Sequence, residues 1–238
     1  MKNDIVHIEL CYRLLGVHII KKHLESVIWY GSASKGQDIH PRSDCDMQII
    51  LNEPSYDATI ELNVILEDYP YVDLSIVYLK DIYDKNGQVV FQNGTKGLFF
   101  IHVLAQGKVL YGKNIYKNIA DRLGLSEIKP SLVFTIREYL SRLRIMATHN
   151  PNDTLRFKKY SLKLLKDILI YKGVISLDEI SQVTYEDTYK KTKNSFNFDS
   201  KTNLIFSKIT DFSSNFTKED MATLLSNYES IVHSSIYE

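Results

Sequence analysis

Two aspartates lie two positions apart at the start of an apolar segment, in the stretch WYGSASKGQDIHPRSDCDMQIIL that covers residues 29–51. The run from Asp46 to Leu51 predicts a β-strand. Because successive side chains of a strand alternate between its two faces, Asp44 and Asp46 point the same way and their carboxylates repel each other. Such oxygens are ligands that Mg²⁺ prefers, with further positions left to water and phosphate. The same spacing is common in solvated turns, so the neighbouring residues must decide.

The residues before this pair are suited to binding phosphate. Gly31 and Ser32 follow directly after the predicted strand Val27–Tyr30, and Lys35 lies in the same loop. A glycine turn after a strand presents backbone N–H groups and a hydroxyl to an anion. The segment therefore favours phosphate chemistry beside a metal site.

A third acid, Asp73, lies in the apolar segment 71–79, which predicts a further strand. An acid inside an otherwise buried strand needs a partner. If this strand runs beside the strand of Asp46, the three aspartates form a triad that holds two divalent ions, with Asp73 near an attacking hydroxyl. The alternative is that Asp73 caps or forms a salt bridge at a strand end.

Together these residues resemble the nucleotidyltransferase motif of the DNA polymerase β superfamily, in particular of its small bacterial members. The motif combines a Gly-Ser turn, a later glycine and paired aspartates, here Gly31-Ser32, Gly36 and Ser43-Asp44-x-Asp46, with a third Asp on a later strand. The resemblance covers roughly residues 20–112. The segment 107–112 is also similar to one that often follows the core in those members.

The resemblance implies transfer of a nucleoside monophosphate from a nucleoside triphosphate to an acceptor hydroxyl or phosphate, with pyrophosphate leaving. We expect the transferred nucleotide to be AMP, from ATP, and the acceptor group to be a hydroxyl. It implies that Asp44 and Asp46 bind two Mg²⁺ or Mn²⁺ ions, and that Asp73 binds the ion at the acceptor and takes its proton.

The resemblance also implies a nucleotide-binding set. Ser32 and the Gly31 turn would hold the β- and γ-phosphates, and Ser43 precedes the paired aspartates within the motif. Lys35 departs from the family pattern, which commonly has arginine there, and the loop 37–42 is slightly long. The basic side chain that meets the triphosphate is therefore left open.

Hydrophobic periodicity predicts two domains: residues 1–125 as an α/β (α+β) core with a mixed sheet, and residues 126–238 as an all-α helical bundle that binds substrate or a partner. The predicted strands are 27–30, 46–51, 71–79 and, at an edge, 108–111. The predicted helices are 3–23, 56–68, 132–147, 155–171, 176–192, 200–211 and 217–236. In order and length only, the second half resembles the helical domain of antibiotic nucleotidyltransferases such as the kanamycin and lincosamide enzymes.

Basic side chains recur at helical spacing in the segment 155–171. They form one face, with Arg156, Lys159, Lys163 and Lys166, while leucines form another. One interpretation is a solvated outer face; the other is that Arg156 or Lys163 binds the triphosphate. Separately, Arg144 and His149 have the Arg-x4-His spacing of a family of helical ribonucleases, a spacing that also occurs readily by chance.

Composition limits the partners. Lys plus Arg and Asp plus Glu both number 29, so the formal net charge is zero and no overall basic surface favours a long nucleic acid. The two cysteines predict reduced thiols, and the charged start and the absence of a long apolar run predict a cytoplasmic protein without a membrane span.

We therefore expect a small-molecule acceptor such as an antibiotic. The alternatives are nucleotidylation of a protein or of a tRNA end in a toxin–antitoxin or defence setting, cyclic oligonucleotide synthesis, and, from another class, a catalytically silent nucleotide-binding regulator. A homodimer is also possible, because small relatives often build sites across dimers.

Overall fold

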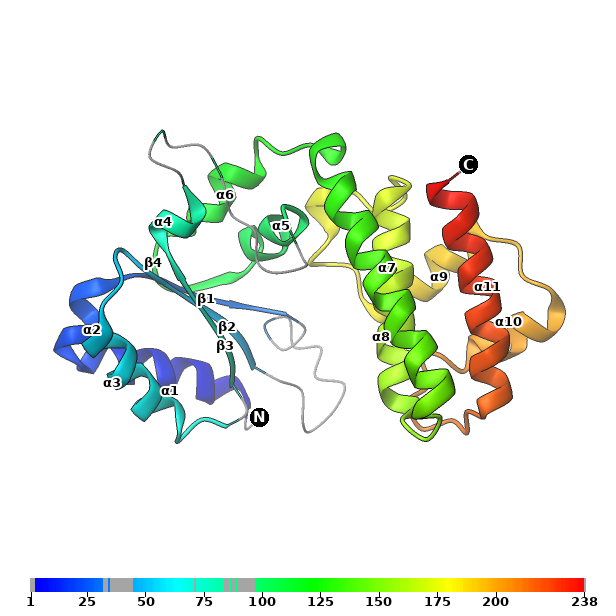
Figure 1. Ribbon diagram of the computed structural model, residues 1–238, viewed down its shortest axis with the longest axis horizontal. Coiled ribbons are helices and arrows are strands. Elements are labelled where there is room, and N and C mark those ends of the chain that lie inside the picture. Colours follow the sequence, from blue (N-terminus) through cyan, green and yellow to red (C-terminus); the bar gives the residue numbers. More distant parts are fainter. Residues whose placement is uncertain are drawn as a thin grey trace. The chain divides into compact units, whose positions relative to one another are not determined.

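The amino-terminal unit is built on a mixed sheet of four strands (Figure 1). The computed structural model describes residues 3–31, 34, 45–70, 72–83, 86, 89 and 97–237. The strands lie in the order β3-β2-β1-β4; β2 and β3 are parallel, and β1 is antiparallel to both β2 and β4. They are β1 (Leu24–Tyr30), β2 (Cys45–Leu51), β3 (Val72–Tyr78) and β4 (Lys108–Gly112). The predicted mixed sheet, with the third strand beside the second, is confirmed.

Helices cover both faces of this sheet (Figure 1). One face packs against α1 (Asn3–Gly16), α2 (His18–His23) and α3 (Tyr56–Leu66), and the other against α5 (Phe99–Ala105) and α6 (Ile115–Ala120). The short helix α4 (Leu79–Ile82) follows β3 directly. The strand β2 alternates accordingly: Met47 and Ile49 lie in the core under α1 and α3, whereas Ile50 lies in the core under α5 and α6.

Two predictions for this unit differ from the structure. The single helix expected over 3–23 is interrupted at Val17, whose extended backbone (φ −92°, ψ 112°) separates α1 from α2. Gly16 and the β-branched Val17 are both poor helix formers, which explains the break. The helices α4, α5 and α6 were not expected, because with four to seven residues each they are too short to show a helical period.

The chain divides into two compact units between Leu123 and Gly124. In its described residues the second unit is helical, as predicted: α7 (Leu125–His149), α8 (Thr154–Tyr171), the 3-10 helix η2 (Leu177–Glu179), α9 (Tyr185–Ser195), α10 (Ser200–Ser207) and α11 (Lys218–Ile236). The helix expected over 176–192 is wrong in its first part. There, Thr184 caps α9 by accepting from the Asp187 N–H, so the long helix starts only at Tyr185.

A buried lysine ties the core of the second unit to its surface loop. Lys158 is 1 % exposed, and its ammonium donates to the carbonyl oxygens of Asp211 (2.7 Å) and Ser214 (3.1 Å) and to the Ser214 hydroxyl (2.9 Å). Burial is the first cause that lowers the pKa of Lys158. These bonds offset the cost of burying the ammonium and fix the loop between α10 and α11.

No helix in the described parts of the chain is long and apolar enough to cross a membrane.

A buried acid lies between α7 and α8. Asp167 is 6 % exposed, and its Oδ2 lies 2.8 Å from the Thr135 hydroxyl, which also lies 3.0 Å from the carbonyl oxygen of Leu132. A hydroxyl has one proton, so both contacts are satisfied together only when the carboxyl of Asp167 is protonated and donates. Burial raises the pKa of Asp167 to about 7. A hydrogen bond that Thr135 donates to the ionised carboxylate acts in the opposite direction but is the smaller effect.

We expect this acid to make the helical unit less stable as the pH rises. The pKa of Asp167 is higher in the folded chain than in the unfolded chain, so the protonated carboxyl stabilises the fold below about pH 4. This stabilisation is lost as the pH rises from about 4 to 7, and the loss in the free energy of unfolding is on the order of 4 kcal/mol at most. Asp167→Asn should remove this pH dependence and be more stable than the wild type at pH 8. Urea unfolding at pH 5 and pH 8 measures it; equal slopes for both proteins would contradict the assignment.

Candidate functional site

The candidate site is centred on two carboxylates that the sheet places side by side. Asp46 and Asp73 are register partners in the parallel pair β2 and β3, each at the second position of its strand. Register partners share a face, so both side chains lie on the face that α5 and α6 cover further along the strands. Like charges directly opposite each other are destabilising unless a cation lies between them.

The burial of the two acids differs from the expectation for Asp73. Asp46 is half-buried, but Asp73 is exposed, because β3 is an edge strand of the described sheet and not a buried one. The interpretation of Asp73 as an acid inside a buried strand is therefore wrong. Its position opposite Asp46, which was expected for a metal site, is what the structure supports.

The turn after β1 lies against the same carboxylate. Gly31 has φ +82°, a conformation that side-chain-bearing residues rarely adopt, and a Cβ added there would lie 2.0 Å from Oδ2 of Asp46. The Ser34 hydroxyl donates to the Gly31 carbonyl oxygen at 2.8 Å and closes the turn. The glycine is therefore required both by the turn and by the close approach of Asp46.

Four of the predicted site residues lie outside the described residues: Ser32, Lys35, Ser43 and Asp44. The structure thus brings together Gly31, Asp46 and Asp73 at one edge of the sheet. The proposed triad is represented there by two of its members. Among the described residues, no group of three or more His, Cys, Asp or Glu side chains is placed to hold a metal ion.

The donor set nevertheless fits a hard divalent cation. Two carboxylates in register on neighbouring strands supply oxygen ligands at adjacent positions, which is what Mg²⁺ requires. Asp44 precedes β2 by one residue in the sequence and lies outside the described residues. The described part of the donor set is therefore the pair Asp46 and Asp73.

Two polar residues of the same sheet face were not singled out from the sequence. Tyr30, the last residue of β1, is the register partner of Asp46, and Gln48, two positions further along β2, is the register partner of Ser75. Tyr30 had been assigned only to a buried strand. The sequence does contain a signal for Gln48, because its carboxamide interrupts the otherwise apolar run Met47–Leu51.

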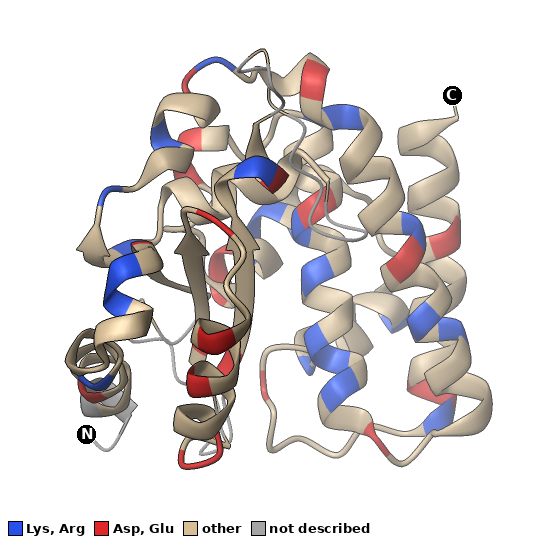
Figure 2. Ribbon diagram, turned by 60° about the vertical axis from the view of Figure 1, so that its left-hand side comes forward, with Lys and Arg blue, Asp and Glu red and all other residues tan. Residues whose placement is uncertain are grey.

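The nucleotide contacts predicted for the second half, Arg156 and Lys163, lie on α8. Basic and acidic positions recur along its helices (Figure 2). Arg156 and Lys163 are exposed, and Arg156 lies 3.4 Å from the capping residue Asp153. Lys166 instead donates to the carbonyl oxygens of Ile180 and Val183, so part of the predicted basic face has a structural role.

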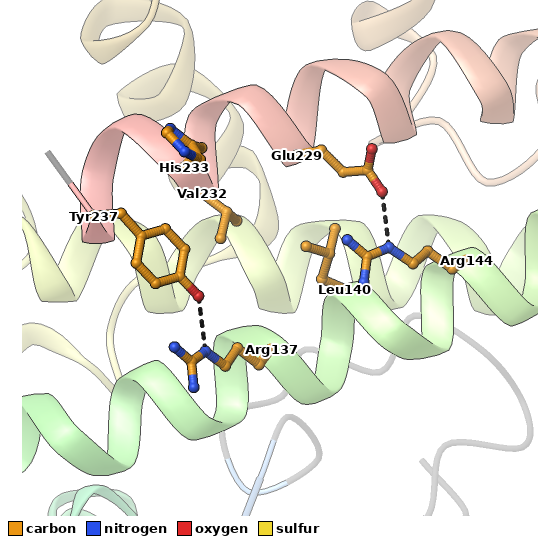
Figure 3. A pocket seen from close by; sticks show the side chains of 7 residues that line it. All are labelled: Arg137, Leu140, Arg144, Glu229, Val232, His233 and Tyr237. Carbon is orange, nitrogen blue, oxygen red and sulfur yellow. Dashed lines mark hydrogen bonds and ion pairs between the residues drawn. The ribbon is translucent and has the colours of Figure 1, made fainter.

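The ribonuclease-like pair is not assembled in this unit. Arg144 bonds Glu229 of α11 at 2.8 Å, whereas His149 lies beside Thr148 (2.6 Å). Arg144 lines a cavity of about 430 Å³ between α7 and α11 (Figure 3). Its lining residues are Arg137, Leu140, Arg144, Glu229, Val232, His233 and Tyr237. The visible role of Arg144 and Arg137 is to tie α11 to α7, since Arg137 donates to the Tyr237 hydroxyl at 2.9 Å.

Comparison with solved structures finds the same fold. The chain is similar to spectinomycin adenyltransferase AAD(9) from Enterococcus faecialis, solved with ATP and spectinomycin, at a TM-score of 0.65 and 13 % sequence identity. The match covers 95 % of this chain and 98 % of that chain. No family model and no curated protein matches the sequence. The expected fold, that of an antibiotic nucleotidyltransferase with a helical second half, is confirmed over almost the whole chain.

The contact between Gly31 and Asp46 gives a first test. Gly31→Ala should lower the free energy of unfolding by about 1–2 kcal/mol, because the new side chain is strained at positive φ and displaces the Asp46 carboxylate. It should also weaken Mg²⁺-dependent binding of ATP, measured by calorimetry. Gly16→Ala in α1 is the control, since a Cβ there meets nothing within 4 Å. Unchanged binding by Gly31→Ala would show that the position of Asp46 does not matter for ATP.

Proposed function

We propose that the protein is a metal-dependent nucleotidyltransferase that transfers AMP from ATP to a hydroxyl of a small-molecule acceptor such as an antibiotic. The observation that carries this proposal is the pairing of Asp46 with Asp73 beside the Gly31 turn, in the fold of an adenyltransferase. A carboxylate pair next to a glycine turn is suited to a cation and a phosphate chain at once.

The reaction assigns separate roles to the residues. The acceptor oxygen forms a bond to the α-phosphorus, the bond from that phosphorus to the bridging oxygen of the β-phosphate breaks, and pyrophosphate leaves. Asp73, the more exposed of the two described acids, accepts the proton of the acceptor hydroxyl. Asp44 and Asp46 would hold the cations, with Asp73 as a further ligand of the ion at the acceptor, while Ser32, Ser43 and the Gly31 turn would bind the triphosphate. When bound, Mg²⁺ offsets the negative charge that gathers on the phosphate oxygens.

The acceptor is inferred from charge and from the structural neighbour. The chain has no net charge, so a long polyanion finds no general attraction to it. The neighbour of the same fold was solved with ATP and an antibiotic. Both points favour ATP as the donor and an uncharged or cationic small molecule as the acceptor.

The direct experiment is pyrophosphate release with Mg²⁺ and each of the four nucleoside triphosphates. Acceptors are supplied as spectinomycin, as pooled aminoglycosides, as pooled lincosamides and as tRNA. Release that depends on ATP and on one of the small molecules supports the proposal. Pyrophosphate release that depends on tRNA would show that the acceptor is a nucleic acid and not a small molecule, and release without any acceptor would point to self-modification or oligonucleotide synthesis. ATP binding without release with any acceptor favours a catalytically silent nucleotide-binding protein.

Replacing each of the two described aspartates should lower turnover for a different reason. Asp46→Asn should lower kcat by roughly a thousand-fold through lost cation binding, and Asp73→Asn by about 10²–10⁴-fold while ATP still binds, because it removes the proton acceptor. Neither change should shift the free energy of unfolding by more than about 0.5 kcal/mol. Glu61→Gln, an exposed acid on α3 that covers the other sheet face, is the matched control. Normal turnover in both aspartate variants would sink the proposed site.

The exposed basic residues of α8 are proposed contacts of the triphosphate. Arg156→Met and Lys163→Met are expected to raise the KM for ATP by about tenfold each if their charge meets a phosphate, as for a lost charged hydrogen bond. Lys193→Met on α9 removes an equally exposed charge and serves as the control. A KM for ATP that stays at the wild-type value in both variants would leave α8 with the solvated outer face that was the alternative interpretation.

A further inference from the structure

Asp46 has a neutral polar neighbour on β1. Tyr30 is its register partner there, as Asp73 is on β3, so the three residues form a row across the sheet. Cross-strand partners share a face, which places the Tyr30 side chain on the carboxylate side. The ring is held edge-on to Phe100 at 5.4 Å and is 7 % exposed.

The Tyr30 hydroxyl lies within the field of both acids. Burial first, and then the charges of Asp46 and Asp73, raise the pKa of Tyr30. No hydrogen bond to another described residue occupies that hydroxyl.

A second neutral group lies one step further along β2. Gln48 is fully buried, and its Nε2 lies 3.5 Å from Oγ of its register partner Ser75. Its Oε1 is buried without a hydrogen-bond partner. Such an atom costs stability, which a leucine of similar size would avoid.

The carboxamide of Gln48 has two possible orientations, which differ by exchange of its oxygen and nitrogen. Rotating the carboxamide by 180° lets the Ser75 hydroxyl donate to Oε1 and places the two N–H donors where no donor now reaches. Asp46 precedes Gln48 by two residues on the same face of β2. Gln48 and the carboxylate row therefore lie on one face of the sheet.

We propose that Tyr30 and Gln48 are positioning residues that orient the carboxylates of Asp46 and Asp73 for the divalent cation. The proposal rests on the proposed function, since it deepens the same site. Partners that donate to ligating carboxylates fix their orientation, and losing one costs about 10–100-fold in metal affinity. Neither residue is assigned a contact with the reacting atoms.

The test measures binding of Mn²⁺, not turnover. The free Mn²⁺ signal is followed by electron paramagnetic resonance during titration of the full chain with an α,β-methylene analogue of ATP present. Tyr30→Phe removes only a hydroxyl, and Gln48→Leu replaces the carboxamide with an apolar group of similar size. Each should raise the Kd for Mn²⁺ by about 10–100-fold, with a thermal midpoint that is unchanged for Tyr30→Phe and unchanged or higher for Gln48→Leu.

Two matched controls separate positioning from packing. Tyr116→Phe removes a phenol hydroxyl from the same apolar cluster, where burial and then Tyr30 and Tyr83 raise the pKa of Tyr116. Ile50→Val alters the next residue of β2 on the same face, which is fully buried. Both should bind Mn²⁺ as the wild type does, even where Ile50→Val lowers the thermal midpoint.

The outcomes distinguish this inference from the proposed function. If Asp46→Asn loses Mn²⁺ but Tyr30→Phe and Gln48→Leu bind it like the wild type, the positioning role is wrong and the metal site stands. If the wild type does not bind Mn²⁺, or Asp46→Asn binds it equally well, the metal site itself is wrong. Equal weakening in the two controls would also overturn the inference, because packing would then explain the effect.

Discussion

The site depends on the parallel, in-register pairing of β2 with β3. Cys45 to Leu51 pair one to one with Val72 to Tyr78, and this register sets Asp46 opposite Asp73. A shift of one residue would turn one of the two acids to the opposite face, where it would meet the apolar core under α1 and α3. The apolar residues of the strands therefore fix the register, and the register in turn forces two like charges together.

The backbone beside Asp46 is tightly constrained. Gly31 leaves no room for a side chain beside Asp46, and the Ser34 hydroxyl closes the turn that carries it. The antiparallel pairing of β1 with β2 ends at this same point, so the end of one strand meets the start of two others. An edge where strands of both directions meet can present a turn and two carboxylates to one ligand.

Much of this arrangement could be predicted from the sequence. The alternating and apolar runs of the strands gave the mixed sheet, and the capping residues Asp153 and Thr217 mark the starts of α8 and α11, near the residues expected. The short helices α4 to α6 could not be predicted, because a single turn or two carries no measurable period. The exposure of Asp73 could not be predicted either, since an apolar strand sequence does not reveal whether the strand lies at an edge.

The polar residues beside the acids show where reading one strand at a time is insufficient. Tyr30 looks like an ordinary member of a buried strand, and only the pairing of β1 with β2 reveals that it is the register partner of Asp46. Gln48 shares a strand face with Asp46, but its burial emerges only from the packed sheet. A fully buried carboxamide with an unpartnered oxygen is a cost that local packing does not repay. The cost falls on the strand face that also carries Asp46 and Asp73, where the sheet is polar, whereas the strand residues that pack under α1 and α3 are apolar.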